Sequence, residues 1–154
     1  MKPPKIYLKK ADFSDAEFLW HLRNQPDVFR YSRQNKKVEW GEHINWMASV
    51  VLGQSNKVLF VIKNQNLPIG QIRFDFLDEK EAEVSIAVLN DFRGKGLAQF
   101  AFKKGLSEVL KEKKLETLKA VINEENRGSV AFFEKLKFEF KDKKGSWLQY
   151  YLHL

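Results

Sequence analysis

The sequence EVSIAVLNDFRGKGLA, residues 83–98, decides the fold. Its first part alternates in polarity, which predicts a β-strand, and the glycines at positions 94 and 96 predict a turn. The apolar pattern that follows, to residue 110, predicts a helix. Such a helix directs unpaired backbone N–H groups and the positive end of its dipole at whatever lies over the turn. The stretch therefore predicts an anion site, and phosphate is its natural ligand.

Two common phosphate-binding fingerprints fail at named positions. A P-loop that ended at Gly94-Lys95 would need a glycine where Leu89 stands and a hydroxyl where Gly96 stands. The dinucleotide pattern Gly-x-Gly-x-x-Gly/Ala, started at Gly94, reaches Gln99 instead of a small residue. Neither a P-loop nor a dinucleotide-binding turn is predicted.

The remaining pattern is Arg-x-x-Gly-x-Ala, at Arg93, Gly96 and Ala98. It resembles the Gln/Arg-x-x-Gly-x-Gly/Ala motif of the GNAT superfamily of acetyl-CoA-dependent N-acetyltransferases, which cradles the pyrophosphate of coenzyme A. Bare backbone at the glycines and positive charge nearby suit that ligand. A turn that only caps a core helix is the alternative. The resemblance implies an acetyl-CoA site at Arg93, Gly94, Lys95, Gly96, Leu97 and Ala98.

A second segment, residues 126–138, resembles the GNAT signature Asn-x-x-Ala/Ser-x-x-x-Tyr-Glu-Lys-x-Gly-Phe. The resemblance implies that Asn126 and Ser129 contact coenzyme A and cap a helix. The tyrosine that commonly protonates the leaving thiolate is replaced by Phe133, and the usual glycine by Lys137. Loss of a general acid costs about 10²–10⁴-fold in rate, so activity should be slowed and not abolished. A catalytically weak protein that only binds coenzyme A stays open.

Composition sets further bounds. A chain of 154 residues is the size of one domain, so we expect a single acetyltransferase domain over residues 1–154. The absence of cysteine excludes a disulfide scaffold, a thiolate zinc site and a cysteine nucleophile, and no metal site is predicted. Neither a signal-peptide pattern nor an apolar run of about eighteen residues is present. We expect a cytoplasmic protein without a membrane partner.

The formal net charge of +7 favours acidic partners, from coenzyme A to a nucleotide-linked substrate or a nucleic acid. A nucleic-acid-binding module, the alternative from another class, predicts basic residues interleaved with aromatic ones on one sheet face. The lysines here are scattered among helix surfaces and turns, so no nucleic-acid partner is expected. Exposed edge strands leave both a monomer and a homodimer open.

The whole chain predicts a mixed α/β domain. Ser14 to Glu17 reads as a capping box that starts a helix at Asp15, which ends near Asn24 to Pro26, and residues 29–35 read as irregular. The further helices are 40–52, the one after the glycine turn, and 127–137; the strands are 5–9, 57–63, 68–77, 81–88, 115–122, 138–141 and 146–153. The GNAT resemblance implies a mostly antiparallel seven-stranded sheet, splayed between the fourth and fifth strands, with about four helices.

Acetylation of an amine needs a base, a positioned thioester and a route for the leaving thiolate. The resemblance assigns the backbone of Ile86, Ala87 and Val88 to the pantetheine arm of coenzyme A. Glu83 is our first candidate base, although a solvated carboxylate is the alternative. Ser85 lies on the same strand face, and its hydroxyl or that of a nearby tyrosine is a candidate to protonate the leaving thiolate. Departure of the thiolate unassisted, or with a proton from water, is the alternative. Glu124 is the second candidate base and His43 the third. A helix histidine whose hydrogen bonds are satisfied is the alternative for His43.

The GNAT resemblance also implies that the acceptor binds where the first two predicted helices face the thioester. There Arg30, Tyr31, His43 and Trp46 resemble nucleotide-linked amino-sugar acetyltransferases of bacterial surface-glycan synthesis, such as those of the pseudaminic acid pathway. Arginines suit a diphosphate, and aromatic rings suit a base or a sugar face. The segment Leu22-Arg23-Asn24 is similar to acetyltransferases that modify the N-termini of ribosomal proteins. A protein N-terminus therefore remains the alternative to a nucleotide-linked amine.

Overall fold

The computed structural model describes residues 5–154. These residues form a seven-stranded sheet in the order β1-β2-β3-β4-β5-β7-β6. The strands are β1 (Ile6–Lys10), β2 (Lys57–Asn64), β3 (Leu67–Phe76), β4 (Glu81–Val88), β5 (Thr117–Asn123), β6 (Glu139–Lys144) and β7 (Trp147–His153). Neighbouring strands are antiparallel except β4 and β5, which are parallel. The predicted mixed, mostly antiparallel sheet is confirmed.

The helices number one more than the sequence predicted. They are α1 (Ala16–Arg23), α2 (Pro26–Phe29), α3 (Trp40–Val51), α4 (Leu97–Leu110) and α5 (Arg127–Lys135), with short 3₁₀ helices at Phe13–Asp15 and Asn90–Phe92. The additional helix is α2, which runs into the segment that we expected to be irregular. Pro26 ends the helical geometry before it and also starts α2, because the fixed φ of proline suits the first position of a helix.

The predicted capping box of Ser14 and Glu17 is wrong. Asp12 takes the N-cap position, and its carboxylate accepts a hydrogen bond from the backbone N–H of Ser14 at 2.8 Å. Asp15 closes the box by accepting from the N–H of Asp12 at 2.9 Å, and it also binds Lys9 at 2.7 Å. Hydrogen bonds from Ser14 and Lys9 lower the pKa of Asp12 to about 2. The aspartate pair is favoured because it also gains ion pairs with Lys9, which the Ser14 hydroxyl could not provide.

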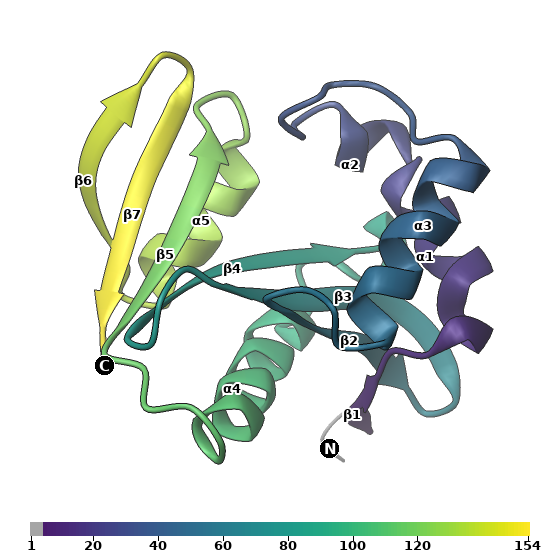
Figure 1. Cartoon of the computed structure of the whole chain (residues 1–154). Coiled ribbons are helices and arrows are strands. Elements are labelled where there is room, and N and C mark those ends of the chain that lie inside the picture. Colours follow the sequence, from purple (N-terminus) through teal and green to yellow (C-terminus); the bar gives the residue numbers. More distant parts are fainter. Residues whose placement is uncertain (1–4) are drawn as a thin grey trace.

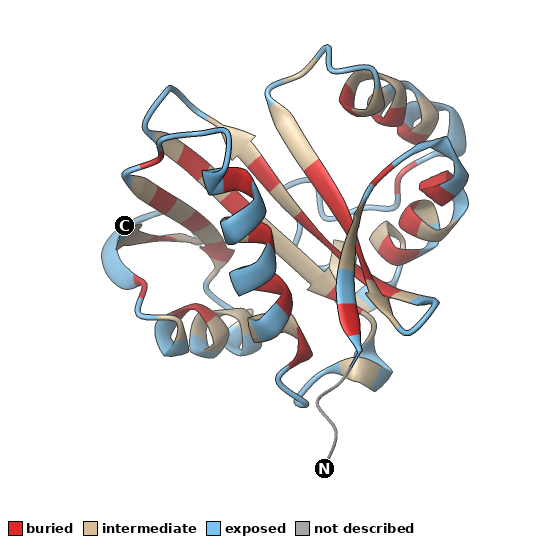
Figure 2. Ribbon diagram, turned by 90° about the horizontal axis from the view of Figure 1, so that it is seen from below, coloured by how far each residue is buried: buried red, intermediate tan, exposed pale blue. Residues whose placement is uncertain are grey.

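Helices cover both faces of the sheet formed by β1 to β4 (Figure 1). On one face, Phe102 and Val109 of α4 belong to a buried cluster with Ile72 and Phe74 of β3. Gly105 allows this close approach, since a Cβ added there would lie 3.2 Å from the ring of Phe74. On the other face, a second buried cluster joins α1 and α3 to β2 through Leu19, Met47, Leu59 and Val61. Figure 2 shows the buried bands that cross the strands and the inner sides of the helices.

The sheet splays between β4 and β5, as predicted. The two strands pair only where Glu81, Ala82 and Glu83 face Thr117, Leu118 and Lys119. Beyond Glu83 the strands diverge, and α2 lies above the opening (Figure 1). The edge of β4 that turns toward β5 is therefore left without a strand partner from Val84 to Val88 in the described part of the chain. No helix within residues 5–154 is both long and apolar enough to cross a membrane.

Candidate active site

A cavity of about 1150 Å³ occupies this opening. It is lined by residues of β3 and β4, of α1 to α3, and of the N-terminal ends of α4 and α5. Basic side chains outnumber acidic ones in its wall: Arg23, Arg33, Lys36, Lys57, Arg73, Arg93 and Lys135 against Asp27, Glu42 and Glu83. Within residues 5–154, no group of three or more His, Asp or Glu side chains could hold a metal ion. The wall is suited to an anionic ligand.

One end of the cavity is the turn that opens α4. Gly94 and Gly96 adopt φ values of +74° and +76°, in the left-handed region that favours glycine. The first helical hydrogen bond runs from the N–H of Phe100 to the oxygen of Gly96, at 3.2 Å. The amides of the first helical turn, Leu97 to Gln99, are therefore left to a ligand, and all three residues line the cavity. This geometry fits the pyrophosphate of coenzyme A.

The two basic residues of this turn have different positions. Arg93 lines the cavity, but its Nε donates to the oxygen of Val88 at 2.8 Å and its guanidinium pairs with Asp27 of α2. It therefore ties the turn both to the end of β4 and to α2. Lys95 is exposed, with its ammonium 5.7 Å from the centroid of the Phe92 ring, and does not line the cavity.

The N-terminus of α5 forms a second part of this end. Asn126 caps the helix, as predicted, because its Oδ1 accepts from the N–H of Ser129 at 3.2 Å, and both residues line the cavity. Phe133 also lines the cavity, although only 4% of it is exposed. Its ring lies with its centroid 5.0 Å from those of both Phe132 and Phe138. Phe133 is thus fixed in the core and has no proton for a leaving group.

The open edge of β4 runs from this end of the cavity toward Glu83, the first candidate base. Ile86, Ala87 and Val88 line the cavity from β4, and Val121 and Ile122 line it from β5. Since β4 and β5 no longer pair at these positions, backbone groups of β4 are available to a ligand that lies between the strands.

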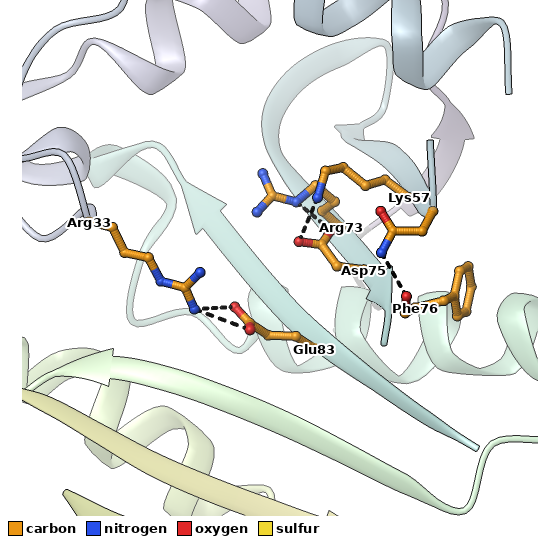
Figure 3. A network of polar contacts seen from close by, with 7 residues as sticks. Arg33, Lys57, Arg73, Asp75, Phe76 and Glu83 are labelled. Carbon is orange, nitrogen blue, oxygen red and sulfur yellow. Dashed lines mark hydrogen bonds and ion pairs between the residues drawn. The ribbon is translucent and has the colours of Figure 1, made fainter. Parts of the chain in front are cut away.

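Glu83 is placed where the splay begins. Its side chain is 16% exposed, lines the cavity, and accepts from Nη2 of Arg33 at 3.2 Å and 3.1 Å through its two oxygens. Arg33 lies in the segment between α2 and α3, so the ion pair joins that segment to β4 (Figure 3). Ser85 lines the cavity two residues further along the strand. The cavity thus contains the first candidate base and one candidate hydroxyl.

The sequence analysis did not predict the group of charged side chains next to Glu83. Asp75 of β3 lies opposite Glu83 in the strand pairing and binds Lys57 at 3.0 Å and Arg73 at 2.8 Å (Figure 3). Lys57 and Arg73 also line the cavity. One sequence pattern could have revealed this group. Along β3, polar residues alternate with apolar ones, which places Gln71, Arg73 and Asp75 on one face of the strand.

The other two candidate bases lie outside the cavity wall. Glu124 follows β5 and pairs with Lys143 of β6 at 2.5 Å. His43 is fully buried in α3, with its Nε2 2.8 Å from the oxygen of Ala16 and its Nδ1 3.0 Å from Nη1 of Arg23. Because a carbonyl can only accept, Nε2 carries the proton and Nδ1 accepts from Arg23. Burial lowers the pKa of His43, which keeps the ring neutral. His43 thus lies behind Arg23, which itself lines the cavity.

Arg23 and Arg73 meet at Trp46. The Cζ of Arg23 lies 4.6 Å, and that of Arg73 5.6 Å, from the centroid of the Trp46 ring, and all three residues line the cavity. Burial, together with the charge of Arg73, lowers the pKa of Arg23. Of the other predicted acceptor contacts, Tyr31 lines the cavity, whereas Arg30 stacks on the ring of Tyr31 at 5.2 Å and lies outside the wall.

Residues 5–139 match the family model described as an acetyltransferase (GNAT) domain. The chain belongs to the GNAT acetyltransferase family. It is an N-acetyltransferase that uses acetyl-CoA, in agreement with the expectation from the two sequence motifs.

Among characterised proteins, this acetyltransferase is similar to acetyltransferase PseH of Campylobacter jejuni, with 25% identity over 129 residues that cover 83% of this chain and 79% of the relative. Among solved structures, it superposes on spermidine N-acetyltransferase from Vibrio cholerae, in complex with CoA and spermine, with a TM-score of 0.82, 17% identity and coverage of 97% and 95% of the two chains. A ribosomal L7/L12 α-N-protein acetyltransferase, RimL, in complex with coenzyme A gives a TM-score of 0.84, 14% identity and coverage of 97% and 94%. At these identities the structures show a shared fold.

Proposed function

We propose that this acetyltransferase acetylates the primary amine of a small acceptor that carries negative charge, and that the acceptor is an amino sugar linked to a nucleotide. The observation that supports the proposal is the basic part of the cavity wall, where Arg23 and Arg73 both lie against the ring of Trp46. The match to acetyltransferase PseH and the sequence resemblance to amino-sugar acetyltransferases point to the same substrate class.

Arg23 makes the strongest case for an anionic acceptor. Its hydrogen-bond partner is the neutral ring of His43, and its guanidinium lies over the indole of Trp46. The charge of Glu42 acts on Arg23, but no carboxylate of residues 5–154 lies within ion-pairing distance of it, whereas Arg73 is paired with Asp75. A partly buried guanidinium without a directly paired carboxylate is costly, and a phosphate or carboxylate of the acceptor would relieve that cost.

The basic residues of the cavity wall also disfavour a polyamine as the acceptor. Spermine is the ligand of the Vibrio cholerae neighbour, but a polycation here would meet repulsion from Arg23, Arg73 and Lys57. The aromatic rings of Tyr31 and Trp46 both line the cavity and suit a base or a sugar ring.

The second candidate is a protein N-terminus, favoured by the fold shared with RimL. The Leu22-Arg23-Asn24 similarity weakens as an argument, because Asn24 is occupied within the fold. Its side chain donates to the oxygen of Val38 at 3.0 Å and accepts from the N–H of Val38 at 2.7 Å. Asn24 therefore fixes the segment before α3 and does not face an acceptor.

Bound acetyl-CoA supplies the activated acetyl group. In the proposed mechanism, the amides at the start of α4 and the Asn126 and Ser129 cap hold the phosphate end, and the open edge of β4 aligns the pantetheine arm. Glu83 removes the proton from the acceptor amine once Arg33 has moved aside. The leaving thiolate cannot take a proton from Phe133. Hydroxyl-bearing residues that line the cavity can supply it: Ser85, Ser129 and Tyr31.

The proposal is tested by thiol release from acetyl-CoA in the presence of a UDP-linked 4-amino sugar, a ribosomal-protein N-terminal peptide or spermidine. We expect rapid release with the sugar alone. Release with the peptide alone would establish the second candidate. If acetyl-CoA binds but none of the three amines causes release, the proposed acceptor class is wrong.

A further inference from the structure

Gln71 of β3 is a buried polar side chain in the wall of the cavity. Only 6% of the residue is exposed, and it lines the same cavity as Arg23 and Trp46. In the strand pairing it lies between Val61 of β2 and Ala87 of β4. Since Val61 packs against α1 and α3, the side chain of Gln71 lies on the face of the sheet that those helices cover.

The Oε1 oxygen of Gln71 is inaccessible to solvent and has no hydrogen-bond partner among residues 5–154. The side chains directly opposite, Val61 and Ala87, are apolar. Arg73, two residues along the strand, donates its Nε to Asp75 and stacks on Trp46. Unpaired polar atoms of this kind are rare in folded proteins and destabilise them, so this one requires an explanation.

We propose that Gln71 recognises the body of the acceptor, by accepting a hydrogen bond from an N–H or O–H group next to the anionic group that faces Arg23. Because Gln71 lines the cavity, a change of side-chain rotamer is enough to bring its amide oxygen against a bound molecule. The proposal rests on the proposed function and extends it. The acceptor must carry a hydrogen-bond donor, separate from the reacting amine, beside its negative charge.

The reacting amine itself is a poor candidate for this bond. Gln71 pairs with Ala87, whereas Glu83 pairs with Asp75, four residues away along the same strands. Four residues of strand span about 13 Å, so the amide and the candidate base contact different parts of one acceptor. A sugar hydroxyl or amide N–H fits such a position.

The test compares Gln71→Met with Gln149→Met. Gln149 of β7 is equally buried at 7% exposure, but it does not line the cavity and holds no unpartnered buried atom. We expect Gln71→Met to raise the Tm by about 2–4 °C, because it removes the unpaired oxygen. It should also lower kcat/KM for the acceptor roughly five- to tenfold, with no change for acetyl-CoA. Gln149→Met should not raise the Tm and should leave both kinetic constants unchanged.

The acceptor in this test is whichever of the UDP-linked 4-amino sugar, the N-terminal peptide and spermidine the wild type turns over best. A lower Tm for Gln71→Met would show that the glutamine only supports the fold, and would overturn the proposal. A raised Tm with unchanged acceptor kinetics would overturn it as well. If the wild type turns over none of the three, the proposed function fails separately. In that case an unchanged or lower Tm for Gln71→Met still overturns the proposal for Gln71, because its amide oxygen is then satisfied within the fold.

Discussion

The two ends of the cavity are built in different ways. The end that we propose for the cofactor is made of short continuous segments, the turn from Arg93 to Ala98 and the helix start from Asn126 to Ser129, and it presents mainly backbone groups. The end that we propose for the acceptor is made of single side chains from α1, α3 and β3, at positions 23, 46, 71 and 73. In our proposal, local geometry holds the cofactor, whereas side chains that only the fold brings together select the acceptor.

Glu83 is the proposed base and lies where the splay between β4 and β5 begins, so its removal should have the largest effect. We expect Glu83→Gln to lower kcat about 10²–10³-fold with little change in KM for acetyl-CoA, because the base is lost and the cofactor end is intact. Steady-state kinetics at saturating acetyl-CoA measure this. Glu124→Gln, at the carboxylate paired with Lys143, is the control and should retain activity. An equal loss in both variants would contradict the assignment of the base.

The cofactor end is tested by Gly96→Ala. A Cβ at a φ of +76° strains the turn and displaces the amides of α4, so we expect kcat/KM for acetyl-CoA to fall about 10- to 100-fold. Gly53, with a φ of +70° beyond α3, is a matched control outside the cavity. Gly53→Ala should destabilise the protein to a similar extent without that kinetic loss. Similar kinetic losses would show that strain alone, and not phosphate binding, explains the result.

The acceptor end is tested by Arg23→Met. This change keeps the packing on Trp46 but removes the positive charge, so the KM for the acceptor should rise about tenfold while that for acetyl-CoA stays unchanged. Arg30→Met removes a charge outside the cavity wall and should have little effect. If Arg30→Met raises the acceptor KM and Arg23→Met does not, the acceptor binds nearer the sequence-predicted residue.

The smallest effect is expected at a residue outside both ends of the cavity, where the chain departs from the family motif. Lys137, which replaces the usual glycine, adopts a φ of +74° directly after α5. The N–H of Lys137 bonds to the oxygen of Glu134 at 2.9 Å, and that of Phe138 to Phe133 at 3.0 Å, which is the Schellman pattern that favours glycine. We expect Lys137→Gly to stabilise the protein by about 1 kcal/mol, or about 2–4 °C in Tm, with unchanged kinetics.

Thermal unfolding measures this effect, with Lys103→Gly inside α4 as the control. A glycine in that regular helix should destabilise the protein by about 1 kcal/mol. A fall in Tm for both variants would show that Lys137 is held by contacts that outweigh its backbone strain.

The sequence predicted the splayed sheet, the glycine turn before α4 and the cap at Asn126. The glycine turn, the Asn126 cap and the splay after Glu83 depend on residues that are close together in the chain or on the order of strands. The capping box and the number of helices were wrong because several residues near Asp12 and Pro26 could serve the same local role. Contacts such as the bond between Lys9 and Asp15 decided among them.

The acceptor half could not be derived from the sequence. His43 looked like a possible base, but the fold buries it against Arg23, and Glu124 looked close to the chemistry, but the β6–β7 hairpin binds it. Gln71 carried no sequence signal beyond its alternation in a strand.

By itself, the sequence predicted the family and a mostly antiparallel seven-stranded sheet. It also predicted the glycine turn before α4, because backbone dihedral angles and helix ends are set by neighbouring residues. Only the tertiary structure decided which charged side chains line the end of the cavity that we propose for the acceptor. Arg23 and Arg73 are fifty positions apart in the chain, and they meet at Trp46 only because α1 and α3 pack on the sheet. Packing of that kind, and the burial that leaves Gln71 unpaired, is a property of the whole fold.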